Sequence, residues 1–564
     1  MRILLFFLFF SNFISAQTVY PKDYFVSPLN IPLLLSGDFG ELRKNHFHTG
    51  LDFKTQQREG LDVFASADGY ISRIKISSFG YGKAIYIDHP NGFTTVYGHL
   101  SKANAIIEAY LKNIHYKEKA FEIEVFPKPN ELVVKKGEII AFSGNSGGSG
   151  GPHLHFEFRD TKTEKIINPM FFGFDKKIAD TKFPIVNALI AYPIDENAVI
   201  NTSQKPTYIN LALQKDGSYL AEKIKAFGKI GFGISAYDMF DFSYNKNGLF
   251  KVETFLNGKS NFAYQFDTFG FDETRYVNAL LDYEKFAKTG ARIQKLFMKN
   301  PYNFSGIKTD ENKGIITLSA NLCQNYRIEV ADFNNNKIVI NVPIVFEDTE
   351  PKILKTDKKT NYFLKVKNDN NYKKDNISVF VPAESFYEDF YLNFDVKNDT
   401  LTFQDDSMPL QSNIIITFED AKPTETEREK MFIASLDEGK LKYNFTKRKG
   451  NEFTAYTKNL GKFVLAKDTI APKITPVNIK EGKLLNKQFS LQLSIIDSFS
   501  GIKEYNGFLN GKWVLFEYDY KTKKLTHYFD ENFLNDGRND LKVVVSDNVG
   551  NSTIFETYFF RNKQ

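Results

Sequence analysis

The chain has 564 residues, too many for one hydrophobic core, and a chain of this length folds into roughly three to five domains. Hydrophobic residues make up 42% of it and aromatic residues 15%, a composition that favours strands. The formal net charge of +5 is small for this length and argues against a dedicated nucleic-acid-binding surface, so we expect no nucleic-acid partner. The single cysteine, Cys323, excludes an intramolecular disulfide and a thiolate-rich zinc cluster, and we expect a buried structural thiol.

The N-terminus is typical of an export signal. Arg2 supplies a positive charge, an apolar run follows over residues 3–10, and Ala16 offers a small residue for cleavage before Gln17. A membrane anchor is the alternative, but this run is too short to span a bilayer. No later stretch approaches about 18 apolar residues. We therefore expect a cleaved signal peptide over residues 1–16, no transmembrane helix after its removal, and an exported protein of the periplasm or cell envelope, or outside the cell.

Residues 24–175 are dense in glycine and in short β-prone runs such as 70–76, and we interpret them as the first domain. The Pro-Asn-Gly turn at 90–92 predicts a hairpin. The stretch 101–132 is more polar and predicts a helix over 103–112 followed by a strand. We interpret this stretch as an insertion at the rim of the domain.

Beyond residue 180 the sequence alternates strand-like runs with Asn-rich turns, which predicts further β-domains. The phrases SAYD, LNGK and VADFNNN return later in similar form as SIID, LNGK and VSDNVGN, at different spacings. Strands that end in Asp-containing turns in this way are typical of immunoglobulin-like sandwiches. We expect an Ig-like β-domain over 180–347, a β-rich domain over 350–466 and a C-terminal Ig-like β-sandwich over 468–562, so the fold class is mainly β.

Histidines concentrate in the first domain, and only His527 lies outside it. They fall largely in three phrases, HFHTGLD (46–52), YGHL (97–100) and GPHLHFE (151–157). On a strand, His153 and His155 would share one face, and His48 and Asp52, four apart, would lie on one side of a strand or turn. Two imidazoles and a carboxylate suit Zn²⁺, and a catalytic zinc needs three such ligands and one open position.

These three phrases, in this order, resemble the signature segments of the lysostaphin/LytM-type zinc metallopeptidases, which cleave peptides of bacterial peptidoglycan. The resemblance covers roughly residues 24–175. It implies an antiparallel-sheet metallopeptidase domain with a substrate groove. It also implies that His48, Asp52 and His155 bind one Zn²⁺ per chain, and that His99 and His153 are the catalytic histidines. One of the two would be the base and the other would stabilise the oxyanion, and the sequence leaves their order open.

Other polar residues near these phrases have simpler interpretations. His46 could be mistaken for a ligand, but we expect it to line the groove. Glu157 could be a general base, but in this family histidines fill that place, so we expect it to form hydrogen bonds around the site. His89 and His115 are expected to be ordinary surface histidines.

The resemblance implies an exported zinc-dependent endopeptidase that hydrolyses peptidoglycan cross-links or stem peptides through a zinc-bound water. The insertion 101–132 would form part of the groove wall. The alternative is a non-catalytic cell-envelope protein that binds the wall or activates other hydrolases, and a third possibility is cleavage of another extracellular peptide. The C-terminal β-domains could contact glycan or envelope proteins, but no motif in them chooses a ligand.

Overall fold

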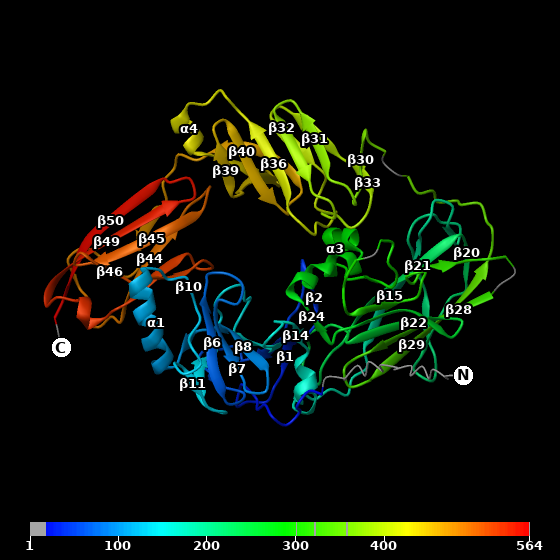
Figure 1. Ribbon diagram of the computed structural model, residues 1–564, viewed down its shortest axis with the longest axis horizontal. Helices are drawn as coiled ribbons and strands as arrows, with labels where there is room; N and C mark the ends of the chain where they lie inside the picture. Colours follow the sequence, from blue (N-terminus) through cyan, green and yellow to red (C-terminus); the bar gives the residue numbers. More distant parts are fainter. Residues whose placement is uncertain (1–18, 301, 321–322, 357–358, 563–564) are drawn as a thin grey trace, which may run out of the picture.

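The computed structural model describes residues 19–300, 302–320, 323–356 and 359–562. The expected signal peptide therefore lies outside the described residues. The described chain is mostly β, as predicted. None of the helices in these ranges is both long enough and apolar enough to cross a membrane. Four β-units follow one another around a ring, and the last unit returns to the first (Figure 1).

The main sheet of the first unit is antiparallel and has the order β1-β4-β13-β8-β7-β6-β10. Its strands are β1 (Leu35–Gly37), β4 (Leu51–Lys54), β13 (His153–Asp160), β8 (Phe93–Leu100), β7 (Lys83–Asp88), β6 (Gly69–Ile76) and β10 (Ile123–Val125). A smaller sheet comprises β5 (Asp62–Phe64), β12 (Ile139–Phe142) and β9 (Lys102–Ala103).

Strand β13 lies between β4 and β8, and its side chains alternate between the core and the opposite face of the sheet. The side chains of Leu154, Phe156 and Phe158 are fully buried in the core of the unit. Because successive side chains point to opposite faces of a strand, His153 and His155 lie on the other face. The alternation predicted from the sequence is confirmed.

The insertion contains helix α1 (Ala105–Glu118), six residues longer at its C-terminal end than predicted. Asn104 caps its N-terminus by accepting a hydrogen bond from the Ile107 N–H at 3.0 Å. Lys119, in the left-handed conformation, ends it. Strand β10 then pairs with β6, so the insertion extends the main sheet.

Two histidines expected on the surface are buried, each about 5% exposed. His89 lies between the Asp68 carbonyl and the Thr95 hydroxyl, which both contact its ring at 2.8 Å. His115 on α1 contacts the Ala120 carbonyl at 2.8 Å. The expectation was wrong because both rings satisfy their polar atoms locally and can then be buried at low cost.

The expectation of a buried thiol was also wrong, because Cys323 is exposed. It begins strand β28 (Cys323–Ala331), in which Tyr326, Ile328 and Val330 point into the core. Residues an odd number of positions away from these face the other side, which places Cys323 toward solvent.

The second unit packs two sheets together. The first contains β17 (Thr207–Ile209), β15 (Ile185–Pro193), β21 (Lys229–Tyr237) and β25 (Gln294–Lys295). The second contains β16 (Val199–Ile200), β20 (Ile224–Phe227), β29 (Lys337–Phe346), β28, β22 (Lys251–Leu256), β23 (Lys259–Gln265) and β26 (Ile307–Thr309). Strand β24 (Thr268–Phe269) pairs with β14 (Ile166–Ile167), an extension of the first unit's sheet, and one continuous core runs through both units.

The third and fourth units each have two larger sheets and a core, and the third also has a two-stranded sheet of β30 (Tyr362–Leu364) and β33 (Phe390–Leu392). In the third unit two five-stranded sheets face each other. The first consists of β31 (Asn370–Lys374), β32 (Ile377–Val381), β36 (Ile414–Glu419), β40 (Glu452–Thr457) and β39 (Thr446–Lys449). The second consists of β34 (Phe394–Lys397), β35 (Thr400–Phe403), β41 (Gly461–Lys467), β37 (Met431–Asp437) and β38 (Lys440–Tyr443). In the fourth unit a four-stranded sheet faces a five-stranded one. The first consists of β42 (Lys473–Pro476), β44 (Ser490–Ile496), β48 (Lys524–Tyr528) and β47 (Glu517–Asp519). The second consists of β43 (Lys483–Leu484), β50 (Ser552–Arg561), β49 (Gly537–Asp547), β45 (Ile502–Leu509) and β46 (Lys512–Val514). The predicted domain boundaries themselves stay predictions.

The fourth unit contacts the first and closes the ring (Figure 1). The Lys83 ammonium on β7 lies 2.8 Å from the Glu517 carboxylate. Tyr116 of α1 stacks on Phe533 with ring centroids 5.0 Å apart. The insertion is thus a docking surface for the fourth unit, a role that the sequence did not predict.

Candidate metal centre

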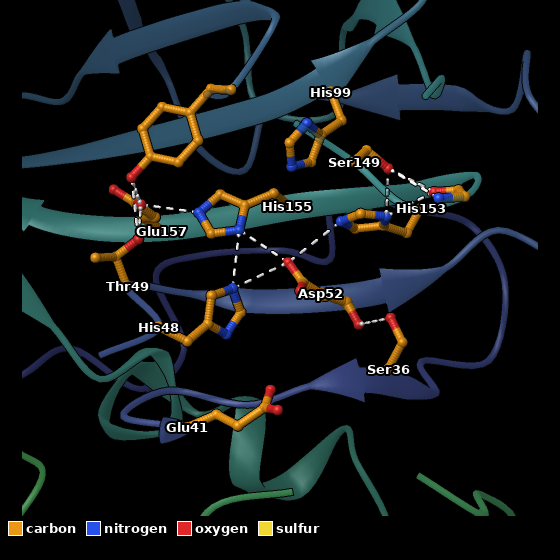
Figure 2. A network of polar contacts seen from close by, with 12 residues as sticks. Ser36, Glu41, His48, Thr49, Asp52, His99, Ser149, His153, His155 and Glu157 are labelled. Atoms are coloured by element: carbon orange, nitrogen blue, oxygen red, sulfur yellow. Dashed lines mark hydrogen bonds and ion pairs between the residues drawn. The ribbon is translucent and has the colours of Figure 1, made fainter. Parts of the chain in front are cut away.

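Three side chains converge at the centre of the first unit's sheet, as Figure 2 shows. Asp52 lies on β4 directly opposite His155 on β13, and His48 lies just before β4. All three are buried, with exposed fractions of 2% for His48, 4% for Asp52 and 3% for His155. The sequence predicted this grouping, and the structure brings the three residues together.

The distances between the inward-facing atoms fit a metal ion. His48 Nε2 lies 3.1 Å from both Asp52 Oδ1 and His155 Nδ1, and these two atoms are 2.8 Å apart. Ligand atoms of a tetrahedral Zn²⁺ are about 3.3 Å from one another, since each lies about 2.0–2.1 Å from the ion. Two imidazole nitrogens and one carboxylate oxygen are also a donor set that Zn²⁺ prefers.

Each of the three side chains is oriented by an outer hydrogen bond. His48 Nδ1 donates to the Asp38 carbonyl at 2.6 Å, which leaves Nε2 to face the site. The Arg43 guanidinium donates to Asp52 Oδ2 at 2.5 Å, which leaves Oδ1 free for an ion. Such outer partners fix the tautomer and direction of metal ligands.

Glu157 orients the third ligand and is fully buried. Its Oε1 lies 2.8 Å from His155 Nε2 and accepts from Thr49 and Tyr81, while Arg159 donates to Oε2 at 2.7 and 2.9 Å. Burial alone would raise the pKa of Glu157, but Arg159 and the hydrogen bonds from His155 and Thr49 outweigh it and hold this pKa well below its usual range. Glu157 is therefore an ionised hydrogen-bond acceptor surrounded by donors.

The two carboxylates set the protonation of the metal-free site. Burial lowers the pKa of His155, but the hydrogen bonds to Asp52 and Glu157 outweigh it and raise this pKa to about 9. Burial lowers the pKa of His48 to about 4. At neutral pH, without metal, His155 is thus an imidazolium between two carboxylates and His48 is neutral.

The two expected catalytic histidines lie side by side next to this cluster (Figure 2). The rings of His99 and His153 are 4.7 Å apart. His99 Nδ1 lies 2.9 Å from the Ser146 carbonyl, and His153 Nδ1 lies 2.8 Å from the Gly151 carbonyl. Because a carbonyl only accepts, each Nδ1 carries a hydrogen and each ring turns its Nε2 toward the site. His153 Nε2 lies 3.5 Å from Asp52 Oδ1.

The local backbone explains how His99 reaches this position. It is the next-to-last residue of β8 and has a φ of 59°, in the left-handed region, and its N–H donates to the Tyr81 carbonyl at 2.8 Å. Burial first, and then the charge of His155, lower the pKa of His99 to about 3, so the ring is neutral at physiological pH. A neutral, pre-oriented imidazole can accept a proton from water.

A cavity of about 690 Å³ opens next to the cluster. Arg43, Asp52 and His153 line it, together with the segment 150–152. The side chain of His46 is exposed and is not among the residues that line this cavity. Of the expected metal ligands, only Asp52 is among the residues that line this cavity.

Sequence reasoning missed the residues that orient the ligands. Arg159 lies two positions after Glu157, and strand alternation could have placed it on the same face. Arg43 and Asp38 lie outside the histidine phrases, and nothing in their spacing signals a contact with Asp52 or His48.

Comparison with known proteins identifies two segments. Residues 46–112 match the model of peptidase family M23, and residues 361–468 match that of the Zu5-like domain. An uncharacterised metalloprotease of Haemophilus influenzae is 35% identical over 123 residues, which are 22% of this chain and 20% of that protein. The DD-carboxypeptidase/endopeptidase Mpg of Neisseria meningitidis is 40% identical over 112 residues, 20% of each chain.

Among solved structures, the catalytic domain of lysostaphin from Staphylococcus simulans is 27% identical, with 24% of this chain and 89% of that chain covered and a TM-score of 0.19. This chain spans about a fifth of the length of the curated relatives it matches. The family match and these relatives show that the chain carries a peptidase family M23 domain, which confirms the resemblance inferred from the sequence. A metalloprotease family implies a metal, and the cluster of His48, Asp52 and His155 fits one.

Proposed function

We propose that this protein is an exported zinc-dependent endopeptidase of the cell envelope that hydrolyses peptide bonds in peptidoglycan cross-links or stem peptides. The observation that carries the proposal is the convergence of His48, Asp52 and His155 beside two further imidazoles. The names of the matched relatives, which include a DD-carboxypeptidase/endopeptidase, support this substrate class.

His48, Asp52 and His155 would hold the zinc ion, which when bound lowers the pKa of a water ligand and polarises the scissile carbonyl. His99 and His153 then supply the proton chemistry. Each directs Nδ1 to a carbonyl and Nε2 to the site, so either Nε2, when unprotonated, can remove the proton of the attacking water. The other, with a proton taken from solvent on its Nε2, would donate a hydrogen bond to the oxygen that develops negative charge.

The cavity beside Asp52 and His153 would hold the peptide in an extended conformation. Ser36 of the edge strand β1 is among its lining residues, while the Leu35 carbonyl of that strand already accepts a hydrogen bond from Ser243. The glycine-rich segment 150–152 brings backbone close to the substrate without side-chain obstruction.

The test is digestion of purified sacculi with the mature protein, followed by mass analysis of the released peptides. We expect peptide release that a chelator abolishes and that Asp52→Ala and His155→Ala both lack. Equal release by these variants and the wild type would contradict the metal site. A protein that only binds the wall would co-sediment with sacculi and release nothing.

A further inference from the structure

A second group of carboxylates lies where the first and second units meet. Asp180 belongs to the segment that leaves the first unit, Asp238 directly follows β21, and Asp332 directly follows β28. One carboxylate oxygen from each lies within 4.8 Å of the others. Their exposed fractions are 9%, 2% and 4%, so the group is buried.

Three oxygen atoms at this place find no hydrogen-bond donor among the described residues: Asp180 Oδ2, Asp238 Oδ1 and Asn247 Oδ1. Asp238 and Asn247 exchange both backbone hydrogen bonds, at 3.1 and 2.9 Å, as an antiparallel pair. Residues paired in this way carry their side chains on the same face. The amide oxygen of Asn247 is therefore directed to the side on which the Asp238 carboxylate lies.

No lysine or arginine in the described ranges forms an ion pair with Asp180, Asp238 or Asp332. Burial and the mutual repulsion of the carboxylates raise the pKa of Asp180 to about 8 and that of Asp238 to about 7. Buried carboxylates in proteins are paired with cations or coordinate metals, because an isolated buried charge is very costly.

We propose that Asp180, Asp238, Asp332 and the side-chain oxygen of Asn247 bind a calcium-class divalent cation. The donor set contains only oxygen, which such hard cations prefer over zinc. Two oxygens bound to one Ca²⁺ are at most about 5 Å apart, since each lies about 2.3–2.6 Å from the ion, and the carboxylate spacing satisfies this limit.

This cation would fix the loop 239–248 against the first unit. Within this loop Ser243 donates to the Leu35 carbonyl at 2.9 Å, and at its end the Gly248 N–H donates to Asp38 Oδ1 at 2.7 Å. The Asp38 carbonyl in turn receives the His48 hydrogen bond. The proposed ion would thus support Asp38 through the loop 239–248, and Asp38 in turn orients the expected ligand His48. The ion itself would not contact the cluster of His48, Asp52 and His155.

A third acidic group, Asp468, Asp497 and Asp547, has the same spacing and provides a matched control. Its carboxylates accept backbone N–H bonds from neighbouring turns: Asp497 from Phe499 and Gly501, at 3.1 and 2.6 Å. Asp468 and Asp547 accept similar bonds. In the proposed site Asp332 and Asp180 also accept hydrogen bonds, from Asn336 and Lys182, but Asp238 Oδ1 and Asp180 Oδ2 have no donor, whereas no carboxylate oxygen of the control group is buried without one.

The test is calorimetric titration of the chelator-treated full chain with calcium chloride, up to about 10 mM, together with thermal unfolding in calcium and in chelator. We expect one calcium site, at least about tenfold weaker in Asp238→Asn, Asp332→Asn and Asn247→Ala. Asp497→Asn should bind calcium as the wild type does.

Thermal unfolding separates ligation from a merely structural role. In chelator, Asp238→Asn should unfold at a higher temperature than the wild type, because it removes one of the repelling carboxylates, and calcium should no longer raise that temperature. The proposal is overturned if the wild type binds no calcium, if only zinc binds, or if the calcium response is lost in Asp497→Asn and kept in Asp332→Asn. It is independent of peptide hydrolysis, since neither measurement uses a substrate.

Discussion

At the scale of single residues, the metal centre depends on partners that do not themselves face the expected ion. Asp38, Arg43 and Glu157 each hold one expected ligand in position. The first two lie outside the histidine phrases, so their contacts follow from the packing of β1 and β2 (Leu42–Arg43) and not from any local pattern. The grouping of His48, Asp52 and His155 could be predicted because these residues stand in short, chemically selective phrases.

We predict that Glu157→Gln lowers zinc affinity about 10- to 100-fold, because the neutral amide orients His155 less firmly. The substitution also leaves Arg159, whose side chain is 3% exposed, without its buried counter-ion. Loss of such a partner costs about 3–5 kcal/mol, so the free energy of unfolding should fall. Zinc titration and denaturant unfolding measure the two effects.

Glu164→Gln is the matched control. Glu164 also contacts Arg159, at 3.1 Å, but its side chain is 60% exposed. The contribution of an exposed pair is below about 1 kcal/mol, and this variant should resemble the wild type. If both variants behave alike, Glu157 does not have the orienting role assigned to it.

We predict that zinc binding at pH 7 releases about one proton. His155 has its pKa raised from 6.5 to about 9 in the metal-free protein, and an ion at Nδ1 must displace that proton. The affinity should therefore rise as the pH approaches 9 and level off above it. In the metal-free protein the same raised pKa stabilises the fold fully below pH 6.5, and this stabilisation is lost as the pH rises through 9.

Calorimetry in two buffers of different ionisation enthalpy measures the number of protons released. Binding at pH 7 without proton release would show that His155 is already neutral in the metal-free protein. Glu157→Gln, which should still bind zinc, should reduce the release, because it removes one of the carboxylates that keep the proton on His155.

At the scale of elements, strand alternation placed His153 and His155 on one face from the sequence alone. The position of His99 could not be predicted in the same way. It depends on the left-handed end of β8 and on the glycine-rich loop 144–151, whose Ser146 carbonyl holds the ring. Loop conformations of this kind are set by close backbone packing, which a hydropathy pattern does not record.

Gly147 is the clearest test of that loop. Its φ is +65°, and a Cβ there would collide with the backbone of Gly80 and Gly82. We predict that Gly147→Ala destabilises the fold by about 1–3 kcal/mol. By displacing Ser146 it should also slow peptide release at least about tenfold, since His99 loses its orientation, while zinc content stays at the wild-type level.

Gly148→Ala is the control within the same loop, because a Cβ there makes only ordinary contacts with Gly80, at 3.4 Å or more. It should retain stability and activity. A Gly147→Ala protein with normal hydrolysis would show that the loop does not position His99.

At the scale of the whole molecule, the sequence predicted the β-rich architecture but not the ring. The contacts of Lys83 with Glu517 and of Tyr116 with Phe533 join residues more than 400 positions apart, and neither surface carries a motif. Contacts between units depend on shape and charge complementarity over surfaces that form only after each unit folds. For the same reason, the core that the first two units share could not be predicted from the sequence.

We predict that Glu517→Lys separates the fourth unit from the first, because it places two positive charges together at a contact where the Lys83 side chain is only 19% exposed. The radius of gyration from solution scattering should rise, and amide exchange in α1 should become faster. Glu556→Lys alters an exposed pair with Lys542, at 2.9 Å within the fourth unit, and should leave both readouts unchanged. An unchanged scattering profile for Glu517→Lys would contradict ring closure through this contact.

The most direct measurement is the zinc content of the purified full chain after equilibration with zinc and removal of the excess. With the proposed calcium site at Asp238 saturated by calcium, we expect one zinc per chain for the wild type and for His46→Ala, since the exposed ring of His46 lies outside the cluster. We expect no zinc in His155→Ala or Asp52→Ala. Stoichiometric zinc in these two variants, or none in the wild type, would contradict the metal centre on which the proposed hydrolysis depends.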